Sequence, residues 1–105
     1  MPDDTAQRFE ARMYDLYHRA KRECGINAVA FLKMLNEHGG LETARLLLHS
    51  PTISEGFTKL WEAKRLDLTV EVLILKPEWD QLFTAEEKSI ARNRLLQYGY
   101  IHNQR

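Results

Sequence analysis

The sequence has very little cysteine: Cys24 is the single one among 105 residues. One cysteine can form neither an intramolecular disulfide nor a cysteine-based zinc cluster. Such a composition suits a reducing compartment, so we expect a cytoplasmic protein. Cys24 falls on the apolar side of the predicted first helix, which indicates a buried, unreactive thiol and not a nucleophile.

Long apolar runs and an excess of either charge are also missing. No run approaches the roughly 20 apolar residues of a membrane span, and the opening stretch MPDDTAQRFEARM lacks the apolar segment of a signal peptide. Fifteen lysine and arginine residues balance fifteen aspartate and glutamate residues. A net charge of zero gives no overall attraction to nucleic acid or to an anionic membrane. A charged partner would therefore have to bind a local patch, and we expect no membrane association.

The spacing patterns of catalytic, metal and cofactor sites are absent from the sequence. It contains no HExxH, no CxxC and no phosphate-binding loop, and no two of its four histidines stand four residues apart. His38 and His49 stand in predicted last turns, where a partial positive charge suits the helix end. We therefore predict a protein that is not an enzyme, with no catalytic residue, no metal site and no cofactor.

What the sequence does contain is enough apolar material for one core. Its hydrophobic fraction is 44%, and a chain of this length forms one domain. The most apolar stretch is 68–75, the second half of FTKLWEAKRLDLTVEVLIL, which is too apolar to face water on any side. Val70, Val72 and Ile74 suit a strand, but a lone strand has nothing to pair with. We predict a short buried helix there.

Capping residues, glycines and prolines divide the rest of the chain into further helices. Asp3, Asp4 or Thr5 is expected to cap the first helix, and Asn27 the second. Thr84 and Glu87 form a capping box before the last helix. The expected helices cover about residues 5–24, 28–38, 41–49, 55–64, 77–83 and 85–98.

These segments predict an all-α fold. We expect residues 1–105 to form a compact single domain of five to seven short helices around the central buried segment 68–75. Trp61 and Phe83 are expected to lie in the core with that segment. Residues 1–4 and 101–105 are expected to be loose ends.

Two carboxylates and one arginine form a predicted polar seam beside the central segment. Asp67 and Glu71 stand four residues apart and would share one helix face, an arrangement that can also serve acid–base chemistry. Arg94 falls inside the apolar arc of the last helix, and a buried charge needs a partner. We predict that Arg94 pairs with Asp67 or Glu71 and holds the last helix on the central segment; a polar functional pocket is the less favoured alternative.

The first helix carries the candidate partner-binding face. Four arginines fall on one arc of about 80° beside its apolar stripe: Arg8, Arg12, Arg19 and Arg22. Such a face could bind an acidic protein surface or a phosphate backbone. Asp15 and Glu23 interrupt it, which weakens the case for nucleic acid and leaves an ordinary solvated face as the alternative.

The second half of the chain resembles a small uncharacterised bacterial domain that occurs alone or appended to larger chains. The resemblance covers roughly half of the chain and implies a compact helical fold in a bacterial or phage setting. The family has no established activity, so no function follows from the resemblance. The matching stretches are Gly56-Phe57-Thr58, Leu60-Trp61-Glu62, residues 65–71, Leu82-Phe83-Thr84 and Tyr98-Gly99-Tyr100.

The leading functional hypothesis is a non-enzymatic protein-binding or regulatory module of bacterial or phage origin, such as an inhibitor or accessory factor. Its partner would be another protein. The alternative is a helical nucleic-acid-associated domain that uses the basic face of the first helix. A homodimer stays open, because the first helix could pair with its own copy.

Overall fold

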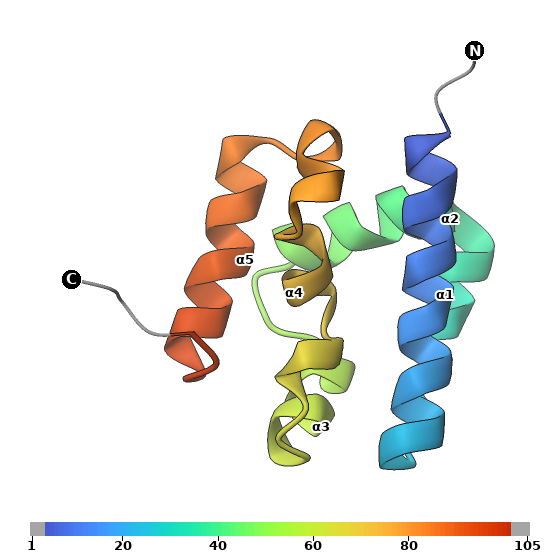
Figure 1. Ribbon diagram of the computed structural model, residues 1–105. Coiled ribbons are helices and arrows are strands. Elements are labelled where there is room, and N and C mark those ends of the chain that lie inside the picture. The colour runs from blue at the N-terminus through green and yellow to red at the C-terminus, as the bar shows by residue number, and fades with distance from the viewer. Residues whose placement is uncertain (1–3, 102–105) are drawn as a thin grey trace.

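The computed structural model describes residues 4–101, which fold into helices joined by short turns (Figure 1). The radius of gyration, 13.3 Å, matches the ~13 Å of a 100-residue domain. The all-α, compact single-domain prediction is confirmed. The elements within the described residues are α1 (Thr5–Cys24), α2 (Val29–His49), α3 (Glu55–Glu62), the 3-10 turn η1 (Leu66–Leu68), α4 (Val70–Ile74), the 3-10 turn η2 (Pro77–Leu82) and α5 (Ala85–Gln97).

The helix α1 and the first part of α2 pack together at one side of the molecule, the second part of α2 runs to the middle, and α5 lies at the opposite side (Figure 1). The short elements α3, η1, α4 and η2 fill the space between them. The helix α4 packs on α5 and also touches both α1 and α2. It is therefore the central element, as the sequence predicts for residues 68–75.

The central segment is helical, as predicted. Within it, Leu68 and Ile74 are almost completely buried. The Thr69 hydroxyl starts α4 by accepting a hydrogen bond from the Val72 amide, at 3.3 Å, and it donates to the Leu66 carbonyl at 2.7 Å. Thr69 is thus the cap of α4.

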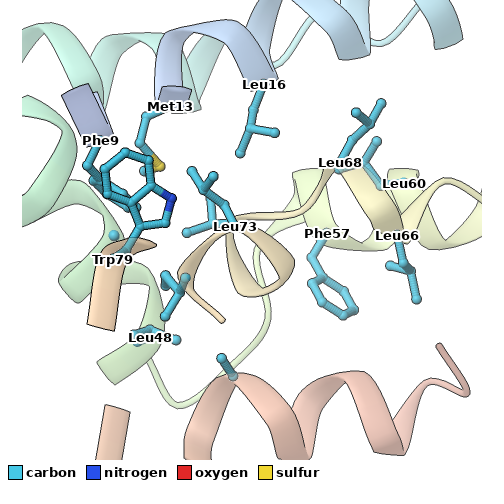
Figure 2. Packing of buried hydrophobic residues seen from close by; sticks show 14 of the residues in the cluster. Phe9, Met13, Leu16, Leu48, Phe57, Leu60, Leu66, Leu68, Leu73 and Trp79 are labelled. Carbon is cyan, nitrogen blue, oxygen red and sulfur yellow. The ribbon is translucent and has the colours of Figure 1, made fainter. Parts of the chain in front are cut away.

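The core runs along both sides of α4. In the view of Figure 2, Phe9 and Trp79 lie at one end of the core, Phe57 and Leu66 at the other, and Leu73 of α4 between them. The Phe9 ring meets Trp79 edge-on, with ring centroids 5.5 Å apart. Aromatic side chains of this size supply much of the buried apolar area that stabilises a small domain.

Trp61 is not in the core, contrary to the prediction. Its side chain is 46% exposed, and its ring packs edge-on against Tyr98, with centroids 5.6 Å apart. The helix α3 turns Phe57 and Leu60 inward. The next residue lies about 100° further round the helix, at the edge of the contact with α5. Phe83, the other aromatic residue expected in the core, is buried there.

Gly39 and Gly40 interrupt α2, as the double glycine predicts. Gly39 has φ 81° and ψ 171°, which breaks the helix into two parts. Gly40 touches α1 directly: a Cβ added there would stand 2.6 Å from the Glu10 Cα. The Glu10 carboxylate accepts a hydrogen bond from the Gly40 amide at 2.7 Å. Glycine at position 40 therefore permits the close approach of α1 and α2.

The capping box predicted for the start of the last helix is confirmed. Thr84 and Glu87 form the capping box of α5. At the other end, the Gly99 amide donates to Leu96 and the Tyr100 amide to Leu95, which is a Schellman ending.

Other predictions about chain ends and helix starts are wrong. The cap of α2 is Ala28, because the Asn27 side chain accepts a hydrogen bond from the Tyr17 hydroxyl at 2.7 Å. Asp4 stands at the N-cap position of α1, as one of the three expected residues, although its side chain makes no capping hydrogen bond. It pairs with Arg8, and Ile101 packs against the core, so neither residue is loose. The remaining residues of the expected loose ends, 1–3 and 102–105, lie outside the described residues.

The Gly40→Ala variant tests the contact between α1 and α2. The added methyl group would collide with backbone, so we expect a loss of about 1–3 kcal/mol in the free energy of unfolding, measured by urea denaturation. Gly56→Ala is the matched control, since its nearest atom would be 3.8 Å away. We expect the control to be at least as stable as the wild type. Equal stability of both variants would contradict the close approach at Gly40.

Candidate functional site

Arg94 of α5 joins three helices through one guanidinium group. Its Nη1 donates to the Glu71 carboxylate and to the Leu47 carbonyl, each at 3.0 Å. Its Nη2 donates to the carbonyls of Leu48, at 3.1 Å, and Ser50, at 2.8 Å. Carbonyls at a helix C-terminus lack partners within the helix. Arg94 therefore closes the end of α2 and pairs with α4 at the same time.

Of the two carboxylates considered for Arg94, Glu71 is the partner. Asp67 is held by Arg65, whose Nε lies 3.0 Å from the Asp67 carboxylate. Glu71 is 5% exposed, and burial raises the pKa of its carboxyl against the opposing effect of Arg94. The polar seam is thus split into two pairs, one buried and one near the surface.

The Arg94→Ala variant tests the buried pair. Removal of the guanidinium leaves the Glu71 carboxylate buried without a partner, which costs about 3–5 kcal/mol of stability. Arg92→Ala is the control on the same helix, because Arg92 is exposed and its loss should change stability by less than about 0.5 kcal/mol. Urea denaturation measures both. Similar stability of the two variants would show that Arg94 does not hold α5 in place.

An apolar cleft of about 230 Å³ lies between the end of α1, the first turns of α2, and the helices α3 and α4. Its lining includes Leu16, Val29, Phe31, Met34, Phe57 and Leu60. Val29 at its edge is 60% exposed, while Phe31 and Met34 are half-buried. Apolar side chains are therefore left accessible to a partner at this place.

The polar groups of the apolar cleft pair with one another. The Tyr17 hydroxyl donates to Asn27. Glu71 pairs with Arg94, and Lys59 lies 3.8 Å from Glu55. Two acidic and two basic side chains leave the lining without net charge.

A second hollow, the polar cleft, lies beside the arginines of α1 and has a volume of about 360 Å³. It brings Arg12 and Arg19 of the predicted binding face together with Asp67 of the predicted seam. Its charged lining is three cations and two carboxylates, which leaves one positive charge. The polar residues of the lining are Arg12, Asp15, Arg19, Asp67, Lys76 and Tyr100.

Most of the predicted arginine face is paired with carboxylates of the chain itself. Arg8 lies 3.0 Å from Asp4, Arg19 2.9 Å from Glu23 and Arg22 3.7 Å from Glu23. Arg12 makes no ion pair with any of residues 4–101. The face is therefore a mixed charged surface, and its role in binding stays a prediction.

Glu23 also ties α1 to the turn before η1. Arg65 donates to it at 2.7 Å, and hydrogen bonds from Arg19 and Arg65 lower the pKa of the Glu23 carboxyl to about 2. The ionised carboxylate thus connects the end of α1 with a segment more than 40 residues further along the chain.

Glu23→Gln provides a test of this connection through pH. The folded-state pKa lies below the unfolded value, so the ionised form stabilises the fold above the unfolded pKa of 4.5, and this contribution is lost as the pH falls towards 2. We expect the wild type to be more stable than Glu23→Gln at pH 7 and the difference to vanish near pH 2. Glu42→Gln, at an exposed position, is the control. A difference that does not depend on pH would contradict this role of the carboxylate.

Comparison with protein-family models, with curated proteins and with solved structures found no match to the chain. The resemblance to a small bacterial domain therefore stays a prediction. No helix within residues 4–101 is both long and apolar enough to cross a membrane. In the same residues, no three acidic, histidine or cysteine side chains gather as metal ligands would. Cys24 is half-buried against the core, less enclosed than expected.

Sequence reasoning missed the apolar cleft. Val29 and Phe31 are apolar residues of a predicted helix. Their spacing along the sequence does not show which of them stays exposed to solvent in the fold. The one local signal is Val29 in the first turn of a helix, where an apolar residue has little to pack against within its own helix.

Proposed function

We propose that the protein is a non-enzymatic protein-binding module that acts as an inhibitor or accessory factor, and that it binds its partner protein through the apolar cleft. The observation that carries the proposal is the accessible apolar lining, edged by the exposed Val29. Burial of such side chains against a partner is the main favourable term in protein association. The resemblance noted above supports a bacterial or phage setting.

The size of the cleft favours side chains of a protein over a separate small molecule. Clefts that enclose drug-sized ligands are about 300–1,000 Å³ in volume, and this one is smaller, at about 230 Å³. Met34 in the lining adds adaptability, because its flexible thioether can fit partner side chains of different shapes. The cleft is suited to a few apolar anchors at the centre of an interface.

The alternative, binding of nucleic acid, has less support. Attraction to a phosphate backbone comes from cations that release counterions, and Arg8, Arg19 and Arg22 already lie beside carboxylates. The polar cleft holds only one net positive charge. We therefore propose that the arginine face contributes to partner binding only at the rim of the protein interface.

Val29→Glu tests the proposed interface. A carboxylate at the edge of the cleft would be desolvated by an apolar partner, so we expect affinity capture from the source organism to lose its specific protein. The fold should be unaffected, because Val29 is exposed and an acidic residue suits the first turn of a helix. Leu46→Glu is the matched control: the same substitution type on the same helix, at a residue that is 41% exposed and outside the cleft.

Capture of the same protein by the wild type and Leu46→Glu, with loss in Val29→Glu, is the expected result. Equal capture by all three baits would remove the apolar cleft as the interface. Absence of any specific protein, together with salt-dependent DNA or RNA binding that disappears in Arg12→Glu, would replace the proposal with the nucleic-acid alternative.

A further inference from the structure

The polar cleft contains charged groups that the fold itself does not use. Among residues 4–101, Arg12, Lys76 and Asp15 of its lining take part in no ion pair. The other two charged side chains of the lining, Arg19 and Asp67, are held in ion pairs with residues outside it. Two free cations and one free carboxylate therefore remain, and together they carry one positive charge.

We propose that the polar cleft binds one carboxylate side chain, an aspartate or glutamate of the partner protein, with Arg12 and Lys76 as its counter-charges. This inference rests on the proposed function and adds a second contact of stated chemistry to the same interface. Leu16 lines both clefts, so a partner protein that covers the apolar cleft also reaches the polar one.

The two free cations stand on backbone that the fold holds in place. Arg12 precedes Met13, which is completely buried on the inner side of α1. The Lys76 amide donates to the carbonyl of the buried Leu73 at 3.1 Å. A bound carboxylate would therefore order two side chains and not the segments that carry them, which keeps the entropic cost of binding low.

The shape of the lining suits a side chain with an apolar stem and a charged end. Its apolar members, Leu16, Val72 and Leu73, are buried or half-buried, whereas Arg12 and Lys76 are exposed. The apolar part therefore lies deeper than the cations. The methylene groups of an aspartate or glutamate can contact it, and the reduced access of water strengthens the attraction of the carboxylate to the cations.

The charge of the lining favours one carboxylate over phosphate groups. A phosphomonoester carries about 1.5 to 2 negative charges at pH 7, which exceeds the single free positive charge, and Asp15 repels the excess. A duplex backbone presents a charge about every 1.7 Å, but Arg8 and Arg19, the next cations along α1, already lie beside carboxylates. The planar guanidinium of Arg12 matches the two oxygens of one carboxylate.

Selection from a displayed library of random 16-residue peptides tests the inference. The immobilised wild-type protein selects the peptides, and those that also bind the double variant Arg12→Gln, Lys76→Gln are discarded. We expect the retained peptides to share an acidic residue. In synthetic copies, its replacement by the corresponding amide should weaken binding to the wild type at least about fivefold, and binding to Arg12→Gln by less. Arg92→Gln, which removes an exposed arginine outside the cleft, is the matched control and should bind as the wild type does.

Asp15→Asn separates recognition of a carboxylate from damage to the fold. Loss of this like charge from the lining should strengthen binding of the acidic peptides by up to about fivefold and leave binding of their amide counterparts unchanged. A damaged cleft would bind both kinds of peptide more weakly. Weaker binding of the acidic peptides to Asp15→Asn would therefore contradict the inference.

The remaining outcomes separate this inference from the proposed function. Retention of no peptide, or of peptides without a shared acidic residue, would overturn the carboxylate contact. Displacement of the peptides by inorganic phosphate more readily than by acetate would identify a phosphate site and overturn it as well. Val29→Glu tests the apolar cleft separately: if it binds the acidic peptides as the wild type does, the carboxylate contact stands and the role of the apolar cleft is wrong.

Discussion

The buried pair of Arg94 and Glu71 is the constraint on which the rest of the structure depends. One guanidinium bonds the carboxylate of α4 and three carbonyls at the end of α2, so three elements distant in sequence must meet at one point. Buried ion pairs add little net stability over apolar packing, but breaking one is costly. The pair therefore acts by excluding other arrangements: α5 cannot slide along α4 without leaving a charge buried and unpaired. We expect this to fix the register of the last helix.

The same pair connects the fold to the candidate site, because Glu71 and Arg94 both line the apolar cleft. The two residues form an ion pair without net charge within a lining that is otherwise largely apolar. Gly40 contributes to the position of α2 in a different way, because its lack of a side chain lets α2 lie against α1. The first part of α2 is held by α1 on one side, and its other side faces the cleft with Phe31 and Met34. The cleft is thus a consequence of how the long helices are fixed.

Features that depend on residues close together in the chain, such as helix starts and caps, can be predicted from the sequence. The helical state of residues 70–74 and the capping box of Thr84 depend on neighbours within a few positions, and both are as expected. The need of Arg94 for a partner follows from its place on an apolar arc, but the choice between Asp67 and Glu71 depends on which helix faces α5. The prediction that Trp61 lies in the core is wrong for a similar reason. Its hydrophobicity does not show that the contact between α3 and α5 ends at this residue. The apolar cleft is a gap between elements, and the one local sign of it is the apolar Val29 in the first turn of α2.

The charges of α1 also have a structural explanation. The cluster of Arg19, Glu23, Arg65 and Asp67 joins the end of α1 to the segment that leads into α4. Surface ion pairs contribute little one at a time, but a network that spans distant segments restricts how they move relative to each other. The network lies beside one wall of the apolar cleft, to which α1 contributes Leu16 and η1 contributes Leu68. Of the four arginines that look like a binding face in the sequence, Arg19 therefore helps to keep that wall in place through Glu23, while Arg8 pairs with Asp4 at the other end of α1.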